Sequence, residues 1–248
     1  MDRQGFHKLF KSPGPVVTPV IHVLDRAQAM RNVAVAVRAG AAGVFLINHD
    51  FPHRHLLPIL RDLRADWPGL WLGVNFLALS GRDAFPLLGR LQAEGCPVDA
   101  YWADDAGLDE RQDEQRQAIE IASIRAGSGW TGLYFGGVAF KAQRPVDPAQ
   151  YRRSAAIARP LVDVVTTSGS ATGHAAEDGK IADFRAGLGD APMALASGVT
   201  PANAARYGRD VDCFLVATGI NRDGDFHNID PVRLDALLKV TRNMGAKP

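Results

Sequence analysis

Residues 193–222 read MALASGVTPANAARYGRDVDCFLVATGINR. Two short apolar runs in this stretch, Met193–Ser197 and Cys213–Thr218, flank an amphipathic segment, Pro201–Tyr207. Each run is almost continuously apolar, which is typical of a parallel strand that is covered on both faces. Each run is also followed by glycine. The stretch therefore predicts a β-α-β unit whose strands end in tight turns.

The same alternation extends toward the N-terminus. Six further apolar runs precede the quoted stretch: Val16–Leu24, Gly43–Asn48, Trp71–Leu77, Asp99–Ala103, Gly132–Phe140 and Val162–Thr167. The remaining helical stretches are Arg26–Ala39, Leu56–Leu63, Asp83–Ala93, Asp113–Ala126, Pro148–Ala158, Glu177–Leu188 and Pro231–Val240. Dividing the 248 residues among eight units gives about 31 residues a unit, the spacing that a (β/α)8 barrel needs.

Eight alternating units predict an α/β protein of one domain, a (β/α)8 TIM barrel over residues 16–248. Residues 1–15 are expected to form a lead-in that covers the bottom of the barrel. An open doubly wound sheet is the alternative, but such a sheet usually has a glycine-rich turn after its first strand. Here the first run continues into His22-Val23-Leu24-Asp25 without a glycine, which favours the barrel.

The composition excludes several classes of protein. With 46% hydrophobic and 22% charged residues, the chain can fill a core and is not expected to be disordered. Its longest apolar run, Ala39 to Ile47, is far shorter than the roughly 20 residues of a membrane helix. The N-terminus lacks the apolar region of a secretory signal, and two cysteines cannot build a disulfide framework, so a cytoplasmic location is expected. The balance of 28 basic and 27 acidic residues argues against nucleic acid or a membrane as partner.

Glycine and hydroxyl residues gather after the last three strands, at the barrel end where active sites lie. Such loops bring backbone N–H groups close to an anion, and the last two βα loops are where barrels commonly hold phosphate. We therefore predict that a phosphorylated small molecule is the partner. The candidate phosphate-binding residues are Ser168, Gly169, Thr172, Gly173, Ser197, Gly198, Thr218, Gly219 and Arg222. The alternative is that the glycines only make tight turns.

Polar residues near the ends of the first four strands are the candidate catalytic residues: His22, Asn48, Asn75 and Asp104. The ordinary pKa of histidine, about 6.5, suits proton transfer near neutrality, although His22 could simply be hydrogen-bonded in the barrel. The amide of Asn75 needs a partner, which is a ligand or a polar group of a neighbouring strand. Asp104 is expected to act as a base or to bind hydroxyls, or else to cap a turn. If Asn48 faces the barrel axis, strand alternation turns His49 away from it.

Several other residues are expected to have structural roles. Lys141 could pair with an anion or form an imine, but its place beyond the strand favours a solvated loop charge. His53 and His55 resemble a metal pair, yet residues two apart at a helix start face different directions. Cys96 and Cys213 have no base nearby in sequence, and Cys213 is expected in the core. We expect neither a resident metal nor a cofactor.

The C-terminal half resembles the BtpA family. The stretches that carry the resemblance are DVVTTSGSATGHAAEDGKIADFR (163–185), LASGVTPANAARY (195–207) and VDCFLVATGINRDGDFHNIDPVRLDAL (211–237). The N-terminal segment PVVTPVIHVL (15–24) is also similar to the first strand of that family. The resemblance implies a phosphate-binding TIM barrel, and one member of the family has a role in photosystem I accumulation. The loop after strand six is also similar, more locally, to the phosphate-closing loop of the tryptophan synthase alpha barrel.

The chain departs from the family where the reacting part of a substrate is expected. Asp25-Arg26-Ala27-Gln28 replaces a proline- and glycine-rich loop, and Asn48-His49-Asp50 stands where a Glu-Asn pair is usual. The leading hypothesis is an enzyme of acid–base chemistry, a lyase, an isomerase or a glycosyl transferase, and a homo-oligomer is compatible with it. The alternatives are a non-catalytic assembly or regulatory factor and, more weakly, a metal-dependent hydrolase that uses His22, His49 and Asp104.

Overall fold

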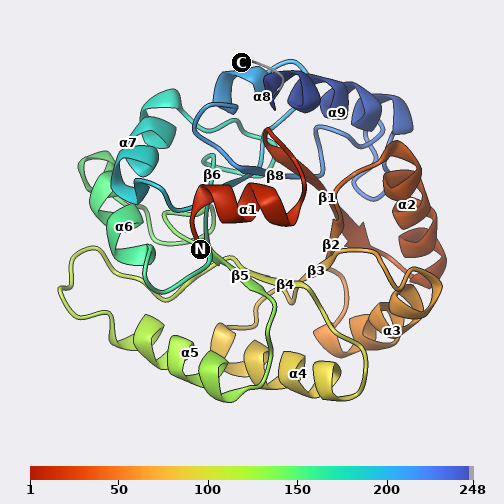
Figure 1. The fold of residues 1–248 in the computed structure, drawn as a ribbon, viewed down its shortest axis with the longest axis horizontal. Coiled ribbons are helices and arrows are strands. Elements are labelled where there is room, and N and C mark those ends of the chain that lie inside the picture. Colours follow the sequence, from red (N-terminus) through yellow and green to blue (C-terminus); the bar gives the residue numbers. More distant parts are fainter. Residues whose placement is uncertain (246–248) are drawn as a thin grey trace.

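Eight parallel strands close into a barrel in the computed structural model, which describes residues 1–245. Each strand pairs with the next along the chain, and the last pairs with the first (Figure 1). The predicted TIM barrel is therefore confirmed. The strands are β1 (Val16–Val23), β2 (Val44–Asn48), β3 (Leu72–Asn75), β4 (Ala100–Ala103), β5 (Leu133–Gly137), β6 (Val164–Ser168), β7 (Met193–Ala196) and β8 (Cys213–Val216).

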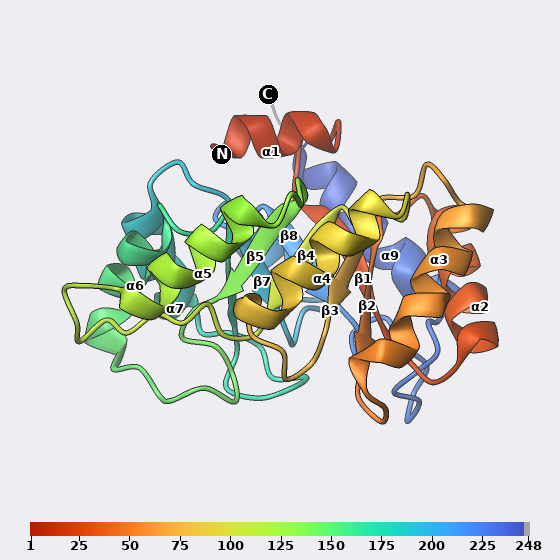
Figure 2. The same cartoon turned by 90° about the horizontal axis from the view of Figure 1, so that it is seen from below.

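Helices surround the barrel and lie antiparallel to its strands (Figure 2). They are α1 (Arg3–Leu9), α2 (Arg26–Ala39), α3 (Leu56–Asp66), α4 (Gly81–Ala93), α5 (Arg116–Gly127), α6 (Tyr151–Ala158), α7 (Asp178–Leu188), α8 (Ala204–Tyr207) and α9 (Pro231–Gly245). The 3-10 turns η1 (His53–His55) and η2 (Pro148–Gln150) precede α3 and α6. Within residues 1–245, no helix combines the length and the apolarity that crossing a membrane requires.

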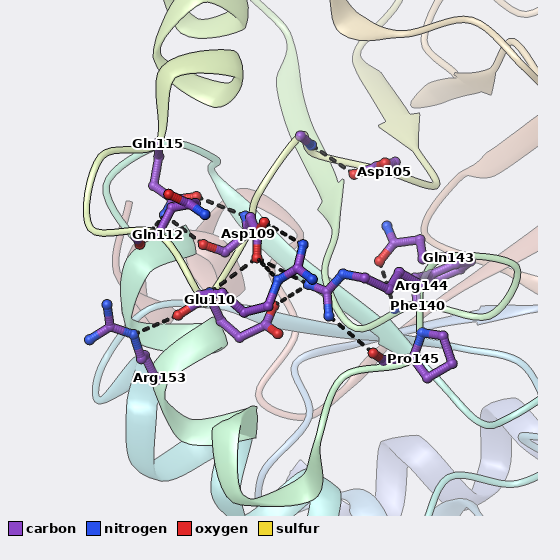
Figure 3. Close-up of polar contacts among 12 residues, drawn as sticks. Asp105, Asp109, Glu110, Gln112, Gln115, Phe140, Gln143, Arg144, Pro145 and Arg153 are labelled. Carbon is purple, nitrogen blue, oxygen red and sulfur yellow. Dashed lines mark hydrogen bonds and ion pairs between the residues drawn. The ribbon is translucent and has the colours of Figure 1, made fainter.

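Helices α8 and α5 each begin three residues later than the sequence predicts, because side chains hold the preceding loops. The amide oxygen of Asn203 accepts from Thr200 N at 2.8 Å and its Nδ2 donates to Gly198 O at 2.7 Å, so α8 starts after the turn at Pro201. Gln115 similarly bonds both backbone groups of Asp109 at 2.9 Å (Figure 3). These bonds compete with helical ones and leave a long loop between β4 and α5.

The barrel has an inner and an outer core, because alternate residues of each strand face opposite sides. On β2, Phe45 and Ile47 pack inside the barrel, whereas Val44 and Leu46 pack against the helices. Gly73 on β3 makes room for Phe45, since a Cβ at that position would overlap the Phe45 ring.

The lead-in contains α1, a helix that the sequence analysis did not predict. It lies across the end of the barrel where the strands begin (Figures 1 and 2). Phe6 is fully buried there against Phe10 and Phe135, with ring centroids 4.9 and 6.4 Å away. Burying such a side chain contributes about 1.5–3 kcal/mol, which holds this short helix in place.

A buried carboxylate fastens the same end. Asp212, directly before β8, is 0% exposed. One oxygen accepts from Arg3 Nε at 2.8 Å and contacts His7 Nε2 at 2.9 Å, and the other accepts from Arg185 Nη2 at 3.0 Å and Met193 N at 2.9 Å. Asp212 thus links α1, α7, β7 and β8.

Candidate functional site

A cavity of about 380 Å³ opens at the carboxyl ends of the strands, opposite α1. Strands or the loops after them contribute lining residues around the whole barrel. The polar lining residues are His22, His49, Trp102, Asp104, Lys141, Ser170, Thr172, Ser197 and Thr218. Because active sites of TIM barrels lie at this end, the cavity is the candidate active site.

His49, rather than Asn48, faces the cavity. It continues the inward-facing series of Phe45 and Ile47, whereas Asn48 points to the loops outside. Asn48 Nδ2 donates to Phe51 O at 2.8 Å, and its oxygen accepts from Leu77 N at 3.1 Å. Its amide is therefore satisfied by backbone groups, and the expectation that Asn48 faces the barrel axis is wrong.

His22 lines the cavity and is only 7% exposed. Its ring lies 3.9 Å from that of Phe226 and 4.7 Å from that of His49, centroid to centroid. Burial, with smaller contributions from His49, Lys141 and His227, lowers the pKa of His22 to about 3. His22 is consequently neutral near pH 7, which suits hydrogen bonding rather than the proton transfer expected from its ordinary pKa.

The loop between β8 and α9 brings Phe226 against His22. Two buried side chains of α2 hold this loop, since Gln28 Nε2 and Asn32 Nδ2 donate to His227 O at 2.5 and 2.8 Å. These polar residues lie on the otherwise apolar face of α2 and thus fix the loop that packs Phe226 against His22.

Asp104 lies at the end of β4 and is supported by Asn75 of β3. Asn75 Nδ2 donates to Asp104 Oδ1 at 2.9 Å, so the partner of the buried amide is a neighbouring polar group. Burial raises the pKa of Asp104, although the bond from Asn75 and the charge of Lys141 oppose this. A carboxyl group with a raised pKa keeps its proton to higher pH than an ordinary aspartate, which suits a general acid.

Lys141 lies on the loop after β5, but its side chain lines the cavity, so the expectation of a solvated loop charge is wrong. The backbone N of Lys141 donates to Ser168 Oγ at 2.8 Å, and the Lys141 Nζ donates to Thr172 Oγ1 at 3.1 Å. Ala139 and Ala142, on either side, have φ values of 45° and 65°, an uncommon backbone for residues other than glycine. Burial lowers the pKa of Lys141, opposed by Asp104.

The loops after β7 and β8 present free backbone donors to the cavity. Ser197 and Gly198 have φ values of 87° and 68°, and a Cβ at Gly198 would overlap the backbone of His174. Within residues 1–245, no protein group accepts a hydrogen bond from the backbone N–H of Gly198, Val199, Thr218 or Gly219. Adjacent free N–H groups of this kind form anion-binding sites.

Three further polar atoms around the cavity are buried and have no partner in the part of the chain that is described. They are His22 Nδ1, Trp102 Nε1 and Ser197 Oγ. Trp102 is 4% exposed, so its indole N–H is an unsatisfied donor next to the cavity. Unsatisfied buried polar atoms are rare in native proteins, and three of those in the described residues belong to side chains that line this cavity, which supports a ligand site.

The structure separates the predicted phosphate residues into two groups. Those that line the cavity are Thr172, Gly173, Ser197, Gly198 and Thr218. Ser168 bonds Lys141 N and Gly169 O instead, while Gly169 and Gly219 pack closely against backbone. The exposed Arg222 does not line the cavity.

Several lining residues were missed or given other roles: Trp102, Lys141, Ser170 and Ala171. Ser170 and Ala171 could have been found, because they lie inside the same glycine-bounded loop as Thr172. Trp102 could also have been found, because it is two residues before Asp104 and side chains two apart on a strand face the same side. For Lys141 the sequence carries no such signal.

The residues proposed for a metal line one cavity but do not form a ligand set. The described part of the chain contains no group of three or more His, Cys, Asp or Glu residues that could hold a metal ion. The suggestion of a metal-dependent hydrolase with His22, His49 and Asp104 therefore lacks a ligand set. Cys96 and Cys213 are buried and free.

Replacing Asn75 by leucine is expected to raise the pKa of Asp104, because the hydrogen bond from Asn75 lowers it. The test is an NMR titration of the Asp104 carboxyl carbon in both proteins. The midpoint should move to higher pH in the variant. Identical titration curves would show that Asn75 does not control this carboxyl group.

Comparison with known proteins supports the fold. No family model matches the chain, and no curated protein matches it. The chain is 15% identical to the tryptophan synthase alpha chain from Legionella pneumophila, with a TM-score of 0.67 over 100% of both chains. It is 12% identical to (S)-3-O-geranylgeranylglyceryl phosphate synthase from Thermoplasma acidophilum, with a TM-score of 0.67 over 97% of this chain and 98% of that one.

A third similar structure is phosphoribosyl anthranilate isomerase from Thermus thermophilus. It is 14% identical, with a TM-score of 0.58 over 92% of this chain and 99% of that one. At such identities the likeness shows the TIM-barrel fold alone. The resemblance to the BtpA family stays a prediction.

Proposed function

We propose that this protein is an enzyme that acts on a small phosphorylated molecule, with BtpA-like proteins as its family. The phosphate binds the loops after β7 and β8, where the cavity-lining residues Gly198, Val199 and Thr218 have free backbone N–H groups. This group of donors is the observation that carries the proposal, because phosphate oxygens accept several such bonds at once.

Similar structures support the choice of ligand. One of them, the geranylgeranylglyceryl phosphate synthase, is described in complex with its substrate sn-glycerol-1-phosphate. Another is a phosphoribosyl anthranilate isomerase, whose name includes a phosphorylated sugar.

Asp104 is the proposed acid–base group. It lies at the cavity, and its raised pKa keeps a proton available closer to neutral pH. His22 and Trp102 line the same cavity and each has an unpartnered ring nitrogen, so they would then orient the substrate by hydrogen bonds. This set of groups suits a lyase, an isomerase or a glycosyl transferase.

The alternative of an assembly factor calls for an exposed apolar surface. The large apolar side chains that are exposed within residues 1–245 are scattered over several segments: Met1, Leu9, Leu24, Val37, Ile119 and Val232. Single exposed apolar residues are normal on protein surfaces, so this distribution does not favour the alternative.

The test is a thermal-shift screen of sugar phosphates and nucleotides against their unphosphorylated counterparts. A phosphorylated ligand at 100 times its Kd should raise the Tm by about 5–10 °C, since binding then stabilises by about 2.7 kcal/mol. The unphosphorylated counterparts should give little shift. No shift from any phosphorylated compound would refute the proposal.

The Thr218→Asp variant should weaken binding of the phosphorylated ligand at least about tenfold, or ~1.4 kcal/mol, because it adds a negative charge beside the anion. Thr218 is exposed, so the fold should tolerate the change. Thr218→Asn is the matched control, with a similar shape but no charge. Titration calorimetry measures both, and equal Kd values would place the phosphate elsewhere.

A further inference from the structure

We propose that Lys141 forms an imine with the carbonyl carbon of a phosphorylated aldehyde or ketone. This inference rests on the proposed function for the place of the phosphate. It adds a covalent step and narrows the substrate to phosphorylated carbonyl compounds.

The position of Lys141 is the first argument. Among residues 1–245, it is the only lysine or arginine that lines the cavity. Its Nζ lies 3.1 Å from Thr172 Oγ1, on the loop after β6 that also borders the phosphate loops. The amine therefore shares one cavity with the proposed phosphate loops and with Asp104, whose charge acts on it.

The surroundings favour an amine over a charged ammonium group. Apolar side chains of Trp102, Ile47 and Leu215 line the same cavity. Burial in such a place disfavours the ammonium form and lowers the pKa of Lys141, which increases the fraction of nucleophilic amine.

Lys180 is the informative contrast within the chain. Burial lowers its pKa to about 8, yet its Nζ donates to Ala139 O at 2.6 Å and Ser168 O at 2.8 Å. It fastens the ends of β5 and β6 and does not line the cavity. A lowered pKa is therefore not the reason for assigning the imine to Lys141. The reason is that Lys141 lines the cavity and Lys180 does not.

Asp104 supplies the protons for the step. The lone pair of the neutral Lys141 amine attacks the carbonyl carbon, and the carbonyl oxygen takes the proton of the Asp104 carboxylic acid. The nitrogen returns one proton to Asp104, which then passes it to the hydroxyl group. That group leaves as water while the nitrogen lone pair forms the C=N bond. Amine, carbonyl and one proton become a protonated imine and water.

Borohydride trapping tests the proposal. The protein is incubated with glyceraldehyde 3-phosphate or glycolaldehyde phosphate, reduced with sodium borohydride and mapped by peptide mass spectrometry. Hydride converts the C=N bond into a stable secondary amine. We expect the adduct on Lys141, at least about tenfold faster than on Lys180 or the exposed Lys239. Excess inorganic phosphate should slow the labelling, and glycolaldehyde without phosphate should label more slowly.

Two variants and one binding measurement separate the outcomes. Lys141→Arg keeps the charge but should abolish labelling, whereas Lys239→Arg should leave it unchanged. Glycerol 3-phosphate, which has no carbonyl group, reports the phosphate site by calorimetry. If it binds but Lys141 is not trapped, the imine is refuted and the proposed function stands. If it does not bind and no lysine is trapped selectively, both fail. If Lys141→Arg does not fold, the peptide map of the wild-type protein still decides.

Discussion

Replacing Asp212 by alanine is expected to lower the free energy of unfolding by about 3–5 kcal/mol. The carboxylate is fully buried and accepts hydrogen bonds from Arg185 and Met193 N as well as from α1. Its loss leaves the largely buried Arg185 guanidinium short of its anionic partner and Met193 N without an acceptor. Urea unfolding followed by circular dichroism measures the effect.

The matched control is Asp178→Ala. Asp178 pairs with Arg206 at 2.6 Å, but both side chains are largely exposed. Exposed pairs contribute about 0–1 kcal/mol, so this variant should be close to the wild type. A loss of less than about 1 kcal/mol for Asp212→Ala would contradict the central role of this carboxylate.

The acid dependence of the Asp212 contribution has a definite sign. Burial alone would raise the pKa of Asp212, but the bonds from His7, Met193 N and Arg3 outweigh it and hold the pKa below its ordinary value. The stabilisation is therefore complete above the pKa of the unfolded chain and is lost as the pH falls through the folded value. The difference between wild type and Asp212→Ala should shrink at strongly acidic pH.

Replacing His22 by glutamine is expected to make the fold less sensitive to mild acid. His22 has a pKa of about 3 in the folded chain and about 6.5 when unfolded, so the unfolded chain binds the extra proton between these values. Wild-type stability should fall as the pH drops from 6.5 toward 3. At pH 5 the contribution of His22 amounts to about 2 kcal/mol, which the variant should not lose.

Urea unfolding at pH 7 and pH 5 measures this difference between the two proteins. His55→Gln provides the control, because His55 is exposed on η1. The control should lose stability between the two pH values as the wild type does. If His22→Gln also follows the wild type, then His22 is not held neutral by its surroundings.

Much of the fold could be predicted because its strands are covered on both faces. Continuous apolar runs such as Met193–Ala196 and Cys213–Val216 are typical of parallel strands that are covered on both faces. Helix α1 could not be predicted in this way. It has seven residues, one of which, Phe6, is buried, and it depends on contacts with distant residues such as Phe135 and Asp212.

The site was predictable where position along a strand decides it. Thr172, Ser197 and Thr218 follow strands and line the cavity, as the barrel rule implies. It is harder to predict which alternate residues of a strand face the barrel interior. On β2 this depends on whether Phe45 faces inward, and it decides whether Asn48 or His49 reaches the cavity. The Lys141 side chain points into the cavity because the loop backbone has positive φ angles at Ala139 and Ala142. Alanine does not normally adopt such angles, so the sequence gives no sign of them.

Helix α1 covers one end of the barrel, and the cavity opens at the other. Residue 1 lies beside α1 and is exposed, on the far side of the molecule from the strand ends (Figure 2). A fluorophore, affinity tag or sensor surface attached at Met1 should thus leave the cavity facing solution. Immobilised protein should bind ligands as the free protein does, whereas coupling through random surface lysines would also modify Lys141.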